Sequence, residues 1–194
     1  MFFGVIEGGN GSGKSSVIDL MAKKNDNIYK TFEPTTGDHG KSAIDLVRKG
    51  EPDAALYYFN MDRAKHLKNV IYPNMQNGKI VLCDRYVYST WVYQCPGDTL
   101  DQWRKNLEEF IIQQPRFLMP HATIMLLVSK EEASRRMSYR GDPFNSEMFD
   151  WEHQKYLELV KMGYGFGIQT DGRSIEDVAE QCARFFMYRV GGRF

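Results

Sequence analysis

Gly8-Gly9-Asn10-Gly11-Ser12-Gly13-Lys14-Ser15 is the stretch of sequence that decides the fold. It satisfies the phosphate-binding pattern GxxxxGK[ST] in full and does not match the dinucleotide-binding pattern GxGxxG. The glycines allow a tight loop whose backbone N–H groups point at phosphate oxygens, and the N-terminus of a following helix adds its positive dipole end. A chance match in a chain of this length is on the order of one in a hundred. We therefore expect residues Gly8 to Ser16 to bind the phosphates of a nucleotide.

Two side chains of the loop predict the chemistry at those phosphates. Lys14 can reach the β- and γ-phosphates, and the Ser15 hydroxyl can bind Mg²⁺. Asp84 ends the clearest apolar strand of the sequence, where its carboxylate can hold the same metal ion. The adjacent Arg85 can bind a second phosphate through both prongs of its guanidinium, although a salt bridge at the strand end is the simpler alternative.

Short apolar runs alternate with amphipathic stretches along the chain. We expect strands at 2–7, 28–33, 79–84, 122–128 and 165–170, and helices at 15–24, 53–76, 87–94, 100–113, 130–138, 147–162 and 174–189. Pro73 should kink or interrupt the helix at 53–76. This alternation predicts an α/β fold, with about five parallel strands and helices on both faces of the sheet. No linker divides residues 1–194, so we expect a single domain.

The composition excludes several classes of protein. Lysine plus arginine and aspartate plus glutamate both number 25, so a formal net charge of zero argues against a protein that coats nucleic acid polymers. Three cysteines without a CxxC pair argue against a disulfide framework or a zinc site. The sequence begins with no basic leader, and its first apolar run is too short to span a membrane. We expect a soluble, cytoplasmic protein without membrane contact.

Four further segments carry a recognisable pattern. Asp84 to Gln94 reads DRYVYSTWVYQ, Phe59 to His66 reads FNMDRAKH, Arg136 to Gly141 reads RMSYRG, and Glu33 precedes Pro34. Together with the loop they resemble the thymidylate kinase family, with its D-R-Y-x-x-S-x-x-A-Y-Q, F-x-x-x-R, R-x-x-x-R-G and E-P elements. The resemblance covers about residues 2–175. It implies a P-loop kinase fold with a short lid at about 139–147, and γ-phosphoryl transfer from ATP to dTMP with Mg²⁺. A homodimer is implied by the resemblance alone.

The resemblance also implies which residues bind the acceptor nucleotide. Phe59 and Arg63 are four residues apart and share a helix face, where a ring can stack on a pyrimidine and a guanidinium can reach its carbonyl edge. The alternative is an aromatic helix packed into the core with arginine at its rim. Tyr93 is implied to lie against the sugar, or else is an ordinary core tyrosine. The full predicted acceptor set is Glu33, Phe59, Arg63, Arg85, Ser89, Thr90 and Tyr93.

Arginines after the 122–128 strand are predicted to neutralise charge on the transferred phosphoryl group, because positioning and electrostatics supply most of this catalysis. Lys14, Arg85, Arg136 and Arg140 form the predicted catalytic set, and Arg135 lies beside them. A solvated basic helix end is the alternative for any single one of these arginines. Which of Arg136 and Arg140 acts on the phosphoryl group stays open.

The sequence departs from the family pattern at several positions. Asn10 stands where the family usually has an acidic residue that contacts the sugar, and Phe32 stands where it has the arginine of R-E-P. Gly11 leaves the loop without the catalytic arginine of one subgroup, and the lid is shorter than usual. These departures make a broader deoxynucleoside monophosphate kinase the nearest alternative.

Two other functions are less favoured by the sequence. A deoxynucleoside kinase would need a carboxylate base for a 5′-hydroxyl, for which Glu33 is the only well-placed candidate, and it would leave Arg85 without a phosphate. A nucleotide-dependent switch would be supported by an N-K-x-D motif that reads guanine, which the sequence lacks.

Overall fold

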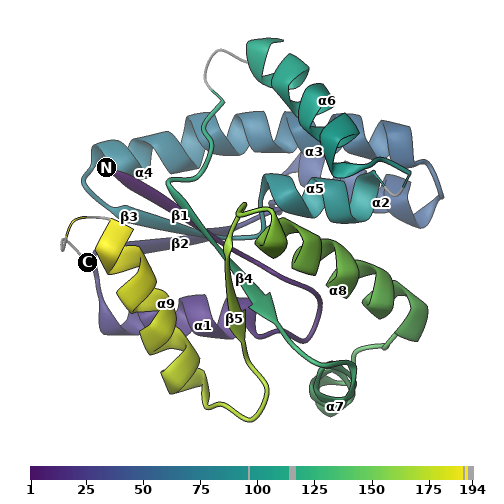
Figure 1. Ribbon diagram of the computed structural model, residues 1–194. Helices are drawn as coiled ribbons and strands as arrows, with labels where there is room; N and C mark the ends of the chain where they lie inside the picture. The colour runs from purple at the N-terminus through teal and green to yellow at the C-terminus, as the bar shows by residue number, and fades with distance from the viewer. Residues whose placement is uncertain (96, 114–116, 190, 192–194) are drawn as a thin grey trace.

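A five-stranded parallel sheet forms the centre of the computed structural model, which describes residues 1–95, 97–113, 117–189 and 191 (Figure 1). The strand order is β2-β3-β1-β4-β5. The strands are β1 (Phe2–Glu7), β2 (Ile28–Phe32), β3 (Ile80–Asp84), β4 (Ala122–Leu127) and β5 (Phe166–Gln169). The predicted α/β fold is confirmed, and every strand begins and ends within one residue of its predicted bounds.

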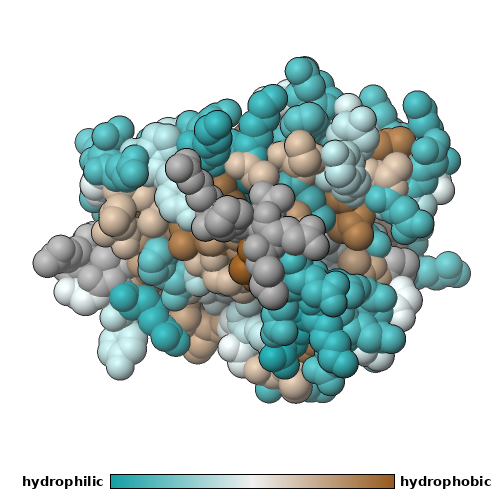
Figure 2. Space-filling view, turned by 90° about the horizontal axis from the view of Figure 1, so that it is seen from above, coloured by the Kyte–Doolittle hydropathy of each residue, from teal (hydrophilic) through white to brown (hydrophobic). Residues whose placement is uncertain are grey.

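Helices cover both faces of the sheet, as expected for parallel strands. On one face lie α1 (Lys14–Lys24) and α9 (Ile175–Arg189); on the other lie α3 (Pro52–His66), α4 (Tyr72–Gln76), α5 (Val87–Gln94) and α8 (Ser146–Lys161). The remaining helices are α2 (Asp38–Arg48), α6 (Leu100–Gln113) and α7 (Lys130–Arg140). Figure 2 shows a largely hydrophilic surface in which hydrophobic side chains are visible between the polar ones. No helix of the described part of the chain combines the length and the apolar character needed to span a membrane.

The central strand β1 separates two hydrophobic clusters. Phe3 and Val5 belong to the cluster under α5 and α8, whereas Phe2 and Ile6 belong to the cluster under α1 and α9. Successive side chains of a strand point to opposite faces, so one strand contributes to both clusters. All six residues of β1 are buried. The phosphate-binding loop therefore starts from the most firmly packed strand of the sheet.

The sequence analysis did not predict helix α2. Its apolar residues Ala43, Ile44 and Val47 recur at helical spacing, so the segment is amphipathic and a local pattern was available. It packs against α3, and its Gly40 lies close to the preceding loop, where a Cβ atom would be 2.1 Å from the carbonyl oxygen of Thr35. An amphipathic pattern and packing against α3 both contribute to this helix.

The predicted helix at 53–76 is interrupted before Pro73. α3 ends at His66, a π-helical turn, η1, spans Leu67–Ile71, and α4 follows directly. Proline has no N–H and its ring clashes with the carbonyl group four residues earlier. The wider π turn, in which the Tyr72 N–H donates to the Leu67 carbonyl, accommodates this missing donor without ending the helical path.

Candidate active site

Three adjoining cavities lie beyond the carboxyl ends of the strands. The loop cavity, about 360 Å³, is lined by residues of the phosphate-binding loop with Asp84, Arg85, Arg140 and Asp142. The α7/α9 cavity, about 400 Å³, shares Gly13, Ser16 and Arg140 with it, and the α3/α5 cavity, about 450 Å³, shares Asn10 and Arg85 with it. A phosphate group in the loop cavity would therefore lie between two side cavities.

The loop adopts a conformation that only glycine tolerates at key positions. Gly8 has φ 144° and Gly13, the residue before α1, has φ 94°. A Cβ atom on Gly8 would also lie 2.4 Å from the Leu126 carbonyl oxygen. The predicted loop thus curls between β1 and the N-terminus of α1, which aims the first N–H groups of that helix at the cavity.

Lys14 lies at the floor of the loop cavity. Its side chain is buried, and its Nζ donates to the Gly9 carbonyl oxygen at 3.0 Å. The pKa of Lys14 is lowered to about 7, chiefly by burial and also by the charge of Arg85, against the opposing effect of nearby carboxylates such as Asp84. An anion in the cavity would supply the negative charge that a buried ammonium group needs.

Ser15 and Asp84 form the corner predicted to hold Mg²⁺. The Ser15 hydroxyl donates to Asp84 Oδ2, while Asp84 Oδ1 is the buried side-chain oxygen of the described residues that has no hydrogen-bond partner. Hydroxyl and carboxylate oxygens are suitable Mg²⁺ ligands, and this ion usually keeps several ligands from phosphate and water. Among the described residues no group of three or more His, Cys, Asp or Glu forms a metal site. These two residues therefore fit an ion shared with bound phosphates.

Arg85 occupies the junction between the loop cavity and the α3/α5 cavity. Its backbone has φ 67°, a left-handed conformation that is uncommon outside glycine. Nη1 donates to the Tyr93 hydroxyl at 2.9 Å and, at 3.3 Å each, to Ser89 Oγ and the Tyr156 hydroxyl. Nη2 donates to Asn10 Oδ1 at 2.8 Å. The guanidinium is thus held in place by neutral groups, which leaves its charge for an anion.

The α3/α5 cavity brings the predicted acceptor residues together. Its lining includes all seven of them: Glu33, Phe59, Arg63, Arg85, Ser89, Thr90 and Tyr93. Arg63 is only 4% exposed, so it belongs to the cavity wall and is not a rim residue. Its Nε donates to Glu33 Oε2 and its Nη2 donates to Thr90 Oγ1, both at 2.9 Å. Glu33 is engaged by this arginine and by His66, whose Nδ1 lies 3.0 Å from Glu33 Oε1.

A second carboxylate under this cavity was not predicted. Glu7 is completely buried and accepts from the backbone N–H groups of Tyr86 and Ser89 and, at 2.6 Å, from the Ser89 hydroxyl. Burial raises the pKa of Glu7. A charged residue at the end of an otherwise apolar strand was the available signal. Glu7 fixes the start of α5 and with it the side chains that face the cavity.

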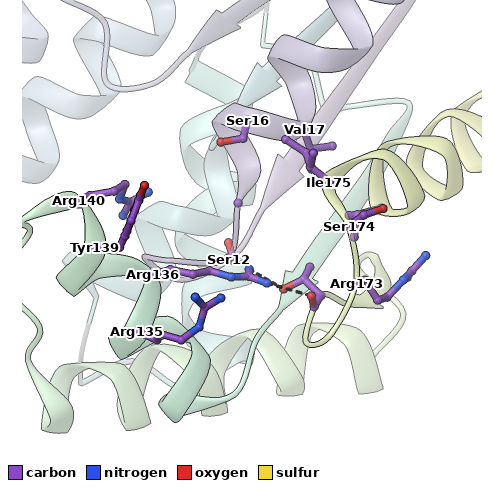
Figure 3. A pocket seen from close by; sticks show the side chains of 13 residues that line it. Ser12, Ser16, Val17, Arg135, Arg136, Tyr139, Arg140, Arg173, Ser174 and Ile175 are labelled. Carbon is purple, nitrogen blue, oxygen red and sulfur yellow. Dashed lines mark hydrogen bonds between the residues drawn. The ribbon is translucent and has the colours of Figure 1, made fainter.

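The structure distinguishes the two arginines predicted to act on the phosphoryl group (Figure 3). Arg136 Nη1 donates to the Gly11 carbonyl at 3.2 Å, and its Nη2 donates to the Thr170 carbonyl at 2.9 Å. Arg136 lines the α7/α9 cavity, whereas Arg140 lines both that cavity and the loop cavity. The Arg140 side chain is 51% exposed and pairs with Asp142 at 2.9 Å. One arginine is fixed to the loop, and the other lies at the surface beside it.

The irregular segment after α7 is shorter than the predicted lid at 139–147. α7 continues to Arg140 and ends at Gly141, which has φ 75°. α8 begins at Ser146, where the Asn145 side chain accepts from the Met148 N–H. Only residues 141–145 are outside a helix, because glycine and asparagine supply efficient caps so close to each other.

Comparison with known proteins identifies the family and supports the fold. The thymidylate kinase family model matches residues 6–182. The probable thymidylate kinase of Pyrococcus abyssi is 31% identical over 210 aligned positions, covering 98% of both chains, and that of Methanococcus aeolicus is 34% identical over 203, covering 95% of both. The fold is similar to the solved thymidylate kinases of Candida albicans (TM-score 0.77, 19% identity, 99% of this chain and 93% of that one) and Ehrlichia chaffeensis (0.67, 22%, 96% and 98%).

The predicted resemblance is confirmed by these matches, which extend over nearly the whole chain and include both the loop and the α3/α5 cavity. The chain belongs to the thymidylate kinase family, whose known reaction is the phosphorylation of dTMP to dTDP.

Proposed function

We propose that the protein transfers the γ-phosphoryl group of ATP to the 5′-phosphate of dTMP, with Mg²⁺ as the metal ion. The observation that carries this proposal is that Asn10 and Arg85 line the loop cavity and the α3/α5 cavity alike. A donor phosphate over Lys14 and an acceptor phosphate on Arg85 would then face each other across a short distance.

The α7/α9 cavity suits the base and sugar of ATP. Arg135, Arg136 and Arg173 line it together with the apolar side chains of Val17, Ile175 and Val178. Guanidinium planes and apolar groups on opposite walls suit a flat aromatic base. The loop N–H groups and Lys14 would bind the phosphates that follow. Mg²⁺ bound by Ser15 and Asp84 would neutralise charge on the β- and γ-oxygens.

The α3/α5 cavity suits the acceptor nucleotide. Phe59 and Arg63 lie on its wall, where a ring can stack on thymine and a guanidinium can bind a carbonyl oxygen. Because Glu33 and Thr90 already orient Arg63, the base would meet a fixed donor. Tyr93 would lie beside the sugar, close enough to Arg85 to share its hydroxyl with that side chain.

The transfer step needs positioning and charge neutralisation rather than a base. An oxygen of the dTMP phosphate, which is largely dianionic near pH 7, forms the new bond to the γ-phosphorus as the bond to the β,γ-bridging oxygen breaks. Lys14 would follow the negative charge toward the leaving ADP, and Arg85 would hold the acceptor in line. Arg140, exposed at the edge of the loop cavity, is the arginine that would move over the transferred group, while Arg136 stays on Gly11.

The homodimer and the cytoplasmic location stay predictions. The test of the proposed reaction is ADP release with ATP and Mg²⁺ against dTMP, dUMP, dCMP, dAMP, dGMP and thymidine. We expect preference for dTMP, and loss of turnover on the order of a thousandfold in Lys14→Ala with an unchanged melting temperature. Similar turnover of several monophosphates would instead favour the broader kinase, consistent with the neutral Asn10. Turnover of thymidine alone would overturn the acceptor assignment.

A further inference from the structure

A buried carboxylate from α8 faces the phosphate-binding loop and has no part in the mechanism above. Glu152 is 2% exposed. Its Oε2 accepts from the Tyr93 hydroxyl at 2.8 Å and from the Asn10 backbone N–H at 3.3 Å. A Cβ atom on Gly9 would lie 3.1 Å from the same oxygen, which is tighter than most Cβ contacts. Burying a carboxylate costs free energy unless hydrogen bonds or an opposite charge compensate, so its partners show what it interacts with.

Both residues that Glu152 contacts, Tyr93 and Asn10, also accept hydrogen bonds from Arg85. The Tyr93 hydroxyl accepts from Arg85 Nη1 at 2.9 Å, and Asn10 Oδ1 accepts from Arg85 Nη2 at 2.8 Å. A tyrosine hydroxyl has one proton, and because Glu152 takes it, the oxygen lone pairs are left for Arg85. Glu152 thus fixes the orientation of one partner of the guanidinium and the backbone of the other.

Glu152 provides a negative charge beside the phosphate-binding loop at Asn10, where the loop itself has no acidic side chain. Asn10 and Tyr93 are neutral, yet they are the two groups nearest the outer edge of the Arg85 guanidinium. Glu152 is one hydrogen bond behind them, and it also contributes to the electrostatic environment of Lys14. A carboxylate at this distance orients the arginine without competing with an incoming phosphate for it.

We propose that Glu152 is a positioning residue for the acceptor phosphate: through Tyr93 and Asn10 it holds Arg85 in the orientation that receives dTMP. This rests on the proposed role of Arg85. It also gives helix α8 a direct connection to the phosphate-binding loop, immediately after the 141–145 segment.

The first test is Glu152→Gln, which keeps the size of the side chain and removes its charge. We expect kcat/KM for dTMP to fall on the order of ten- to a hundredfold, the effect of losing hydrogen bonds to a charged group, with KM for ATP unchanged. The matched control is Glu158→Gln, an exposed glutamate on the same helix, which should leave both constants unchanged. Activity of Glu152→Gln equal to the wild type would overturn the proposal.

The second test moves the charge. Asn10→Asp in the Glu152→Gln background places a carboxylate directly at Arg85 Nη2, and we expect it to restore most of the dTMP activity. Tyr93→Phe should reproduce the selective loss, and adding Glu152→Gln to it should cost little more. Equal losses toward ATP and dTMP, together with a lower melting temperature and no rescue by Asn10→Asp, would show a structural role only and overturn the proposal.

Arg85→Ala separates this proposal from the one on which it rests. If Arg85→Ala leaves KM for dTMP unchanged, the assignment of Arg85 to the acceptor phosphate fails, and the role of Glu152 fails with it. If Arg85→Ala raises KM for dTMP while Glu152→Gln behaves as the wild type, only the Glu152 proposal fails.

Discussion

The two side cavities of the active site present their arginines differently. In the α3/α5 cavity, Arg63 is buried and Arg85 is half-buried, and each donates at least three hydrogen bonds to groups of the cavity wall. At the α7/α9 cavity, the side chains of Arg135 and Arg140 are 69% and 51% exposed and pair with neighbours on the surface. Arg136 of the same cavity is held by hydrogen bonds to two backbone carbonyl groups, so the exposed arginines that are not yet in position are Arg135 and Arg140.

This difference between fixed and exposed arginines suits two tasks, the discrimination between bases and the closure of the site over a bound nucleotide. A fixed donor such as Arg63 discriminates between bases because a wrong base leaves its hydrogen bonds unmade. Side chains that must still be ordered bind more weakly, but they can close over a nucleotide after it has entered. We infer that specificity resides on the acceptor side of the molecule and that adjustment resides on the donor side.

The comparison predicts its largest effect for Arg63→Ala. The variant leaves the buried Glu33 without its arginine, so the free energy of unfolding should fall by about 3 kcal/mol, and kcat/KM for dTMP should fall on the order of a hundredfold. Arg135→Ala, on the exposed side, should change the free energy of unfolding by less than about 1 kcal/mol. Urea unfolding and steady-state kinetics of both variants check this. Equal losses of stability would contradict the distinction between the two cavities.

A smaller effect is expected from a change of pH on ATP binding, through Lys14 in the loop cavity that lies between the two side cavities. The pKa of Lys14 in the free protein is about 7, and its protonated form is the one that attracts phosphate. ATP binding should therefore weaken as the pH rises through 7, by roughly fivefold between pH 7 and pH 8. Calorimetric titration at several pH values measures this, with Lys14→Arg as the control because arginine does not titrate in this range. Equal pH dependence in that variant would assign the effect to ATP itself.

The smallest effect is expected at the donor edge. Tyr139 is 91% exposed and lines the α7/α9 cavity beside Arg140 (Figure 3). Tyr139→Ala should raise KM for ATP about threefold, the size of a single aromatic contact, and leave KM for dTMP unchanged. Tyr188→Ala is the matched control, because Tyr188 is 84% exposed on α9 and lines none of the three cavities. A change in KM for dTMP would show that the two sides are not independent.

Local patterns in the sequence were sufficient to predict much of this site. The loop from Gly8 to Ser15 and the segment from Asp84 to Tyr93 each follow a strand, and parallel strands place such segments at one edge of the sheet. The roles of Phe59 and Arg63 were implied by the resemblance and agree with their helical spacing, and both residues line the α3/α5 cavity. These features depend on residues that are close together in the chain.

The features that the sequence did not predict depend on residues far apart. Glu152 and Asn10 are separated by 142 positions, and neither has a local pattern that points to the other. Glu152 is four residues before Tyr156, which shows a shared helix face but not the loop that this face meets. Helix α2 is an exception, because its apolar residues recur at helical spacing and a local pattern could have identified it. Sequence periodicity indicates whether a segment is a helix or a strand and which face is buried, but it does not indicate which other element packs against that face.

The position of β1 in the middle of the sheet has a consequence for how the chain folds. β1 pairs with β3, beginning with Phe2 and Ile80, and with β4, beginning with Gly4 and Ala122. Both pairings close large loops, and their entropic cost must be met before the strand is stabilised. During synthesis, β1 leaves the ribosome well before both of its neighbours, and β4 is made only after more than a hundred further residues. Until then, its apolar residues depend on chaperones or on transient contacts for protection from aggregation.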